Sequence, residues 1–188
     1  MARLDSETGI WSLGLAKKNH KHDSGLVQGI IEIYHPNQFA DIGCGDGWYC
    51  SEFKKAGWPI VHGYEGTKGV KELGFYDDIF YIDLTKVRYV GIDYDLVMCL
   101  EVGEHIPVEH EDIFLDNLVR YCSKDLILSW ASPGQKGSGH FNCREPEYIK
   151  KKLAKYGFIE NQLNSIKLIS YSKLSWIRRN VRAYVRSK

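Results

Sequence analysis

The sequence predicts an open, doubly wound α/β sandwich built from one domain. Short apolar segments of strand character alternate with helical segments of ten or more residues, which is typical of βαβ units and a largely parallel sheet. The first strand-like segment runs directly into a glycine-rich turn, the place where such sheets bind ligands. The chain has 188 residues, of which 44% are hydrophobic and 26% are charged, and is long enough to bury one core. We therefore expect residues 1–188 to form a single domain.

The elements follow from local signals along the chain. Residues 1–22 are polar and form an N-terminal extension. A first helix begins after the N-cap pair Asp23-Ser24, carries its apolar residues on one face, and ends before Pro36. Strands are expected at 38–43, 59–65, 79–84, 94–100, 125–131, 157–160 and 181–186. Further helices are expected at 47–57, 111–123 and 145–157, with helix-ending glycines at Gly57 and Gly157.

Alternation in the last strand predicts one buried and one solvated face. The residues expected to be buried are Val181, Ala183 and Val185, and those expected to be exposed are Arg182, Tyr184 and Arg186. A solvated strand face accounts for these arginines without nucleic acid. No pattern of interleaved aromatic and basic residues predicts a platform for stacking bases.

Composition argues against several other classes of protein. The formal net charge is +1, so the whole molecule has no strong attraction to nucleic acid or membrane. The five cysteines are scattered, odd in number and without a CxxC pair, which argues against a disulfide framework or a cysteine zinc site. No apolar leader and no apolar run long enough to cross a bilayer is visible. We therefore expect a soluble, cytoplasmic protein.

The glycine turn follows the first strand and opens a helix. Gly43, Gly45 and Gly47 let the backbone turn tightly and approach a ligand closely. The spacing is GxGxG, and Asp41 and Asp46 stand beside the turn. These carboxylates would repel the pyrophosphate of a nicotinamide cofactor, which argues against an oxidoreductase. They suit S-adenosylmethionine, which carries a sulfonium and an ammonium group and no phosphate.

Two more acids end the neighbouring strands. Glu65, eighteen residues after Gly47, is placed to accept hydrogen bonds from both ribose hydroxyls. Asp83 ends the third strand, where it would bind the adenine amino group while Leu84 covers the ring. Together these residues predict a nucleoside pocket.

A second constellation follows the fourth strand. Glu101, Glu104 and His105 fall on one side of the chain if it turns helically after the strand. His140 lies in the Gly- and Ser-rich loop after the fifth strand, whose end is adjacent. Two carboxylates and two imidazoles at one sheet edge form a metal-ligand set. Without a metal, His105 or His140 would serve as a general base, or these residues would only contact the cofactor or hold the loop.

The motif "DIGCGDG" with Glu65 and the "IDL" acid resembles the class I S-adenosylmethionine-dependent methyltransferases. This resemblance covers the chain from about Gly25 onward. It implies a Rossmann-like seven-stranded sheet in the order 3-2-1-4-5-7-6, with an antiparallel last strand. It also implies a set of cofactor-binding residues: Asp41, Gly43, Cys44, Gly45, Gly47, Tyr49, Glu65, Gly66, Asp83, Leu84, Leu100 and Glu101.

The pattern ExxEH with a later histidine is similar to two metal-using branches of that superfamily. These are the ubiquinone-biosynthesis O-methyltransferases and the small-RNA 3′-terminal 2′-O-methyltransferases. The resemblance to the latter implies metal ligands at Glu101, Glu104, His105 and His140. The size of the chain and its "GQKGSGHFN" loop look closer to small sugar O-methyltransferases of large algal viruses, which would place the protein in the host cytoplasm.

We therefore expect an S-adenosylmethionine-dependent O-methyltransferase acting on a vicinal diol of a sugar or glycan, with rhamnose as one candidate. A divalent cation, Mg²⁺ or Mn²⁺, would orient the diol and lower the pKa of one hydroxyl. The alternative acceptors are an RNA terminal ribose and a small phenolic metabolite. A chain of 188 residues has little room for a separate RNA-recognition domain, which counts against the RNA acceptor. An inactive cofactor-binding regulatory subunit is the alternative from another class.

Several other residues carry two interpretations each. Trp11, His20 and His22 either belong to a lid over the cofactor or are ordinary packing and surface residues. Trp48 and Tyr49 either line the methionine pocket or pack in the core. Four residues near the fifth strand either shape the acceptor pocket or have structural roles: Trp130, Gln135, Asn142 and Arg144.

Overall fold

The computed structural model describes residues 4–89 and 91–187, and the ends of the expected domain lie outside them. The helices of this part are α1 (Leu13–Asn19), α2 (Ser24–Ile33), α3 (Trp48–Lys55), α4 (Glu111–Tyr121), α5 (Pro146–Lys155), α6 (Gln162–Tyr171) and α7 (Ser175–Asn180). The strands are β1 (Gln38–Ile42), β2 (Ile60–Glu65), β3 (Ile79–Tyr81), β4 (Tyr94–Leu100), β5 (Cys122–Ser129), β6 (Phe158–Glu160) and β7 (Arg182–Arg186). Short 3₁₀ helices cover Val70–Leu73, Gly103–His105 and Val108–His110.

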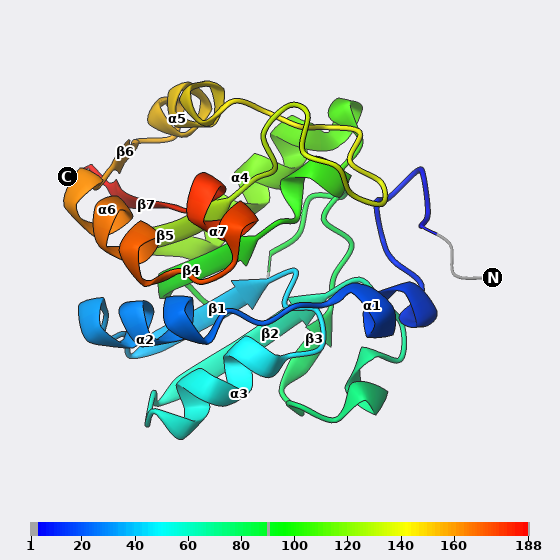
Figure 1. The fold of residues 1–188 in the computed structure, drawn as a ribbon, viewed down its shortest axis with the longest axis horizontal. Helices are drawn as coiled ribbons and strands as arrows, with labels where there is room; N and C mark the ends of the chain where they lie inside the picture. Colours follow the sequence, from blue (N-terminus) through cyan, green and yellow to red (C-terminus); the bar gives the residue numbers. More distant parts are fainter. Residues whose placement is uncertain (1–3, 90, 188) are drawn as a thin grey trace.

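All seven strands form one sheet in the order β3-β2-β1-β4-β5-β7-β6 (Figure 1). The first five pair in parallel, and β7 is antiparallel to both of its neighbours, β5 and β6. This confirms the strand order that the resemblance implied. The direction of chain progression reverses between β1 and β4, so the carboxyl ends of these strands open a crevice for a ligand.

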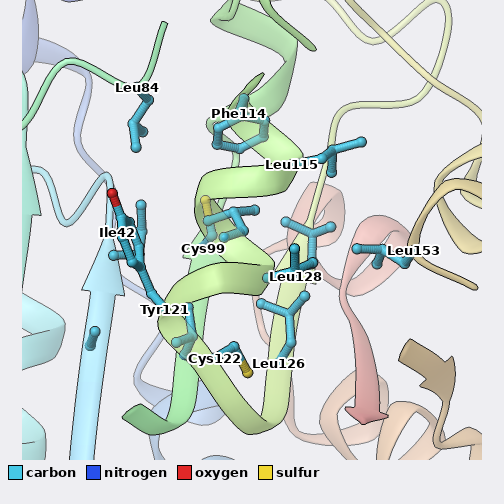
Figure 2. Close-up of a cluster of buried hydrophobic side chains, with 14 of the residues drawn as sticks. Ile42, Leu84, Cys99, Phe114, Leu115, Tyr121, Cys122, Leu126, Leu128 and Leu153 are labelled. Atoms are coloured by element: carbon cyan, nitrogen blue, oxygen red, sulfur yellow. The ribbon is translucent and has the colours of Figure 1, made fainter. Parts of the chain in front are cut away.

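Helices cover both faces of the sheet, because side chains alternate along the strands and both faces are apolar. In β4, Leu96 and Met98 join the cluster beneath α2, α3, α6 and α7, while Val97 and Cys99 join the cluster beneath α4 and α5. Figure 2 shows the second cluster, where Phe114 and Leu115 of α4 pack over the sheet. The two clusters hold the sheet rigid from both sides and fix its carboxyl edge.

The last strand differs from the sequence prediction. Tyr184 is 2% exposed and packs in the cluster beneath α4 and α5, so its prediction as an exposed residue was wrong. Val185 was expected to be buried but is only partly buried. The reason is that β7 lies between β5 and β6 and is covered on both faces, so simple alternation of buried and exposed residues does not apply.

Three helices were not predicted: α1, α6 and α7. Helix α1 begins at the N-cap Ser12, and α6 begins at Asn161, whose side chain accepts a hydrogen bond from the backbone of Asn164. Helix α7 has six residues and lies between α6 and β7, at the ligand edge of the sheet (Figure 1). No helix in the described part of the chain is both long and apolar enough to span a bilayer.

Candidate active site

A cavity of about 630 Å³ opens at the carboxyl edge of the sheet. It is lined by the loops that follow β1, β2, β4 and β5, by the N-terminal segment, and by α7. This volume lies within the usual range for small-molecule sites. The cavity is therefore where the α/β architecture predicts a ligand.

The glycine turn forms one wall of the cavity. Gly43 and Gly45 have φ angles of 75° and 58°, the left-handed region that favours glycine. A Cβ on Gly45 would collide with the ring of His20, and one on Gly43 would collide with Val102. Gly47 also has a positive φ but packs against Tyr76 and Ile79 and does not line the cavity. Gly47 thus shapes the start of α3, whereas Gly43 and Gly45 let the backbone approach a ligand.

Carboxylates gather at this end of the cavity. Glu65 accepts hydrogen bonds from the backbone N–H groups of Gly45 at 3.0 Å and Thr67 at 2.8 Å. Asp41 is buried, and its burial, with the carboxylates of Glu65 and Asp46, raises its pKa well above the usual range. A cationic ligand here would relieve that repulsion, whereas a phosphate would increase it. The donor set fits S-adenosylmethionine in this respect.

Asp83, the acid expected to bind the adenine amino group, does not line the cavity with these carboxylates. Its carboxylate accepts hydrogen bonds from the N–H of Thr85 at 3.1 Å and the hydroxyl of Thr85 at 2.6 Å, and pairs with Lys86 at 2.8 Å. Burial alone would raise its pKa, but hydrogen bonds from Lys86 and Thr85 hold the pKa below its usual range. Ile82 and Leu84 line the cavity, whereas Asp83 does not. The side chain of Asp83 therefore secures the loop after β3.

The other expected cofactor residues lie around the same cavity. Tyr49 lines it while its hydroxyl accepts a hydrogen bond from the N–H of Asp23 at 2.9 Å. The remaining lining residues from that set are Cys44, Gly66, Leu100 and Glu101. Their role in binding a cofactor remains a prediction.

A second group of polar side chains lines the same cavity. Potential ligand atoms of Glu104, His105 and His140 all lie within 4.8 Å of one another. The 3₁₀ helix Gly103–His105 presents the first two, as the expected helical turn after the fourth strand implied. Both oxygens of Glu104 are fully buried and lack a hydrogen-bond partner among the described residues. Burial, and then the carboxylate of Glu101, raise the pKa of Glu104 well above its usual range.

The two imidazoles are oriented by backbone carbonyl groups. His105 Nδ1 lies 3.0 Å from the carbonyl oxygen of Gly139, and His140 Nδ1 lies 3.0 Å from that of Gln135. A carbonyl only accepts, so Nδ1 of each ring is the donor, and in the neutral tautomer Nε2 is left with the lone pair. His140 Nε2 lies 3.9 Å from Glu104 Oε1. This is how proteins orient metal-binding histidines, and an orphaned buried carboxylate completes a set that fits a divalent cation.

Burial lowers the pKa of His105 to about 4, so its ring is neutral at physiological pH. A hydrogen bond to Gly139 works in the opposite direction, and His140 adds to the lowering. A neutral imidazole is able to bind a metal or accept a proton. The geometry therefore permits both of the roles expected for this histidine.

Glu101 lies beside this group but is held separately. It is the only non-glycine residue with a positive φ in the described chain, at 54°. Its carboxylate accepts hydrogen bonds from Gln135 Nε2 at 2.7 Å and from Asn180 Nδ2 at 3.1 Å. Asn180 Nδ2 also donates to Gln135 Oε1 at 2.8 Å. We call Gln135 and Asn180 the amide clamp. Because both oxygens of Glu101 are already engaged, only three of the four expected ligands cluster.

The N-terminal segment covers the opening. Trp11 stacks on His20 and meets His105 edge to face, with ring centroids 5.8 and 5.0 Å apart. His22 Nε2 lies 2.8 Å from Asp46 Oδ2, and its ring stacks on Trp48. Trp11, His20 and His22 all line the cavity, an arrangement that fits the lid interpretation.

Three residues considered for the acceptor pocket point elsewhere. Trp130 is buried and donates to the carbonyl oxygen of Asn142 at 2.5 Å. Arg144 pairs with Glu111 at 2.7 Å, away from the cavity lining. Asn142 is buried and outside the lining, and its backbone N–H donates to the carbonyl of Glu104 at 3.0 Å. These residues brace the loop that carries His140.

Some cavity residues carried no clear signal in the sequence. Lys136 and Ser138, in the loop after β5, line the cavity. So do Ser175, Trp176 and Arg179 of α7. Residues 175–179 precede the expected last strand and were assigned to no element in the sequence. Only the tertiary fold brings this short helix to the cavity.

No protein-family model matches the sequence, and no curated protein matches it. Solved structures, by contrast, do match this chain. The sugar N-methyltransferase KedS8 from Streptoalloteichus sp ATCC 53650 is 13% identical with a TM-score of 0.68, and 88% of each chain is covered. Magnesium protoporphyrin IX methyltransferase (ChlM) from Synechocystis PCC 6803, with bound S-adenosylhomocysteine, is 20% identical with a TM-score of 0.62, covering 93% of this chain and 83% of that one.

The methyltransferase domain of bacterial CtHen1 is 16% identical with a TM-score of 0.59, covering 94% of this chain and all of that one (100%). Identities this low establish the architecture, while function depends on the site. The resemblance seen in the sequence is thus confirmed at the level of the fold. This chain has the Rossmann-like fold of the class I S-adenosylmethionine-dependent methyltransferases.

Proposed function

We propose that this protein is an S-adenosylmethionine-dependent methyltransferase that acts on a hydroxyl of a small sugar or glycan. The observation that carries the proposal is the joining of two sites in one cavity. The acidic glycine turn and the group of Glu104, His105 and His140 line the same cavity. A cofactor held on the turn would thus have its reactive end near groups able to activate an acceptor.

The acidic end supports binding of the cofactor. Asp41, Asp46 and Glu65 favour a ligand with positive charge, and Leu84 and Leu100 offer apolar cover for a ring. Bound S-adenosylmethionine would supply an electrophilic methyl group. The chain itself contributes the close backbone approach at Gly43 and Gly45, which excludes water from that side.

The acceptor end supports activation of a hydroxyl. Nε2 of His105 and of His140 are both lone-pair atoms, and Glu104 is a buried carboxylate without a partner in the described chain. Two imidazoles and a carboxylate favour Mn²⁺ or another first-row ion over Mg²⁺, which prefers an all-oxygen shell. Such a cation would lower the pKa of a bound hydroxyl. In its absence, His140 Nε2 is placed to accept the proton directly.

A sugar acceptor is favoured by two considerations. KedS8 is named as a sugar N-methyltransferase, which supports a sugar as the acceptor molecule, and the cavity is of small-molecule size. An RNA terminal ribose stays the second candidate, because the ExxEH pattern with a later histidine is similar to the small-RNA 2′-O-methyltransferases, and a terminal ribose presents the same vicinal hydroxyls to the histidines. An acceptor panel of free sugars, short glycans, a phenolic compound and an oligoribonucleotide separates these options.

The test begins with calorimetric titration of the protein with S-adenosylmethionine and S-adenosylhomocysteine. We expect both to bind and nicotinamide dinucleotides not to bind. Methyl transfer to the acceptor panel is then measured with EDTA and after Mn²⁺ is restored. Loss of activity in EDTA and its return with Mn²⁺ would support the metal, whereas full activity in EDTA would assign the step to histidine. Cofactor binding without turnover on any acceptor would favour a regulatory subunit.

A further inference from the structure

We propose that the acceptor of this site is a phosphorylated sugar, and that Lys136 and Arg179 bind its phosphate group. This inference rests on the proposed function and specifies its substrate class. We call Lys136, Trp176 and Arg179 the basic rim, because all three line the same cavity as the acidic glycine turn.

The amide clamp joins the two segments that carry these cations. Lys136 follows Gln135, and Arg179 precedes Asn180, and these two amides are hydrogen bonded at 2.8 Å. The hydroxyl of Ser132 also donates to Asn180 Oδ1 at 3.1 Å, a second tie between the loop and α7. Figure 1 shows α7 and the yellow loop before α5 at the same edge of the sheet. Two segments far apart in the sequence are thus joined directly beside their cations, and both cations line the cavity.

Neither cation has a partner among the residues that the structure describes. Within residues 4–89 and 91–187, the side chains of Lys136 and Arg179 form no ion pair and no hydrogen bond. Arg144 and Lys152, by contrast, are each paired with Glu111. Glu101 lies against the amide clamp, but both of its oxygens are occupied by Gln135 and Asn180. Lys136 and Arg179 are therefore available to a ligand.

The cavity is polarised as a result. The cavity lining includes Asp41, Asp46 and Glu65, which favour positive charge, and the basic rim, which favours negative charge. An arginine fork with a lysine suits the several oxygens and double charge of a phosphate better than those of a neutral sugar. Trp176, which is 36% exposed at the rim, offers an aromatic face to the sugar ring.

The test uses inorganic pyrophosphate as the probe, titrated by calorimetry into protein saturated with S-adenosylhomocysteine. We expect millimolar or tighter binding that weakens as salt is raised. The double variant Lys136→Gln/Arg179→Gln should lose about tenfold or more in affinity, because each lost contact is charge-assisted. The matched control is Lys71→Gln/Arg88→Gln, which removes two exposed charges outside the cavity lining and should change affinity less than about twofold.

The outcomes separate this inference from the proposed function. Both double variants should keep the wild-type affinity for S-adenosylhomocysteine, so the absence of cofactor binding would count against the proposed function alone. No pyrophosphate binding, or equal binding by the rim variant and the wild type, would overturn the phosphate site.

In turnover assays, a hexose 1-phosphate and a nucleoside diphosphate hexose should each be preferred over the parent hexose, and the better of the two identifies the source of the phosphate. A preference for the oligoribonucleotide would overturn the assignment to a small sugar.

Discussion

Glu104 combines complete burial with the absence of any hydrogen-bond partner in the described chain. An ionised carboxylate in that position is costly unless a cation or a proton neutralises it. We therefore expect Glu104→Gln to abolish measurable Mn²⁺ binding in a calorimetric titration and to lower methyl transfer by about a hundredfold or more. The fold should survive, because the amide has the same shape and carries no charge. Glu109→Gln, an exposed change of the same type, is the control; unchanged Mn²⁺ binding in Glu104→Gln would remove this residue from the metal site.

Glu101 shows a different use of a carboxylate at the same strand end. Its left-handed backbone is strained for a residue with a side chain, and such strain persists only where surrounding contacts enforce it. The amide clamp supplies those contacts. We expect Asn180→Ala to lower the free energy of unfolding by roughly 1–3 kcal/mol, because Gln135 and Ser132 would also lose a partner. Urea denaturation measures this loss, and a change below a few tenths of a kcal/mol would show that the clamp is unimportant.

Elements with strong local signals could be predicted from the sequence. Every strand was expected within a few residues of its bounds, because each is an apolar segment bounded by turns or helices. The helices α2, α3, α4 and α5 also carried clear apolar periodicity or caps. Helix α7 could not be found, since six residues are too few to show a period, and α6 exposes Leu163 and Ile166 on its outer face.

In the candidate site, too, some residue positions could be predicted from the sequence and others could not. Strand-end residues such as Glu65, Glu104 and His105 were predictable, because the carboxyl ends of parallel strands meet at one edge. The surroundings of Asp83 and of Glu101 were not predictable. Asp83 is paired with Lys86, and Glu101 is held by Asn180 of α7. Tyr184 was assigned to the wrong environment because burial of both faces of β7 is a property of the assembled sheet.

Asp23 links three elements and gives an element-scale prediction. It caps α2 by accepting from the N–H of Leu26 at 2.9 Å, and it also accepts from Ser172 and from the N–H of Leu174 at the α6–α7 junction. Burial would raise its pKa, but hydrogen bonds from Ser172 and these N–H groups outweigh burial and lower the pKa. We expect Asp23→Ala to lower the free energy of unfolding by about 2 kcal/mol or more.

The effect depends on pH in a defined direction. Because the folded pKa of Asp23 is depressed, its stabilisation is present above the ordinary value of 3.8 and is lost as pH falls through the lowered folded pKa. Wild-type stability should therefore decline over that acid range more steeply than that of Asp23→Ala. The comparison variant Asn161→Ala removes only the cap of α6 and should cost about 0.5–2 kcal/mol without this pH dependence. Parallel acid profiles for Asp23→Ala and wild type would contradict the assignment.

At the scale of the whole molecule, the cavity is built from segments that are far apart in the sequence. The sheet supplies a rigid edge, while residues 8–11 and 19–22, the loop before α5, and α7 surround the opening. Rigid strands beneath mobile or short covering segments are a common way to admit a ligand and then exclude water. The N-terminal segment contacts the rest of the cavity through side chains on Asp46, Trp48 and His105.

His22 is the strongest of these ties, and its removal tests whether the segment closes over a bound cofactor. We expect His22→Ala to weaken S-adenosylhomocysteine binding several-fold, because the hydrogen bond to Asp46 and the stack on Trp48 are both lost. Limited proteolysis within residues 1–22 should be slowed by the cofactor in wild type and much less in the variant. His35→Ala, an exposed histidine outside the cavity lining, should behave as wild type. If the cofactor protects neither protein, the segment does not act as a lid, and the contacts of His22 serve only to dock the N-terminus on the sheet.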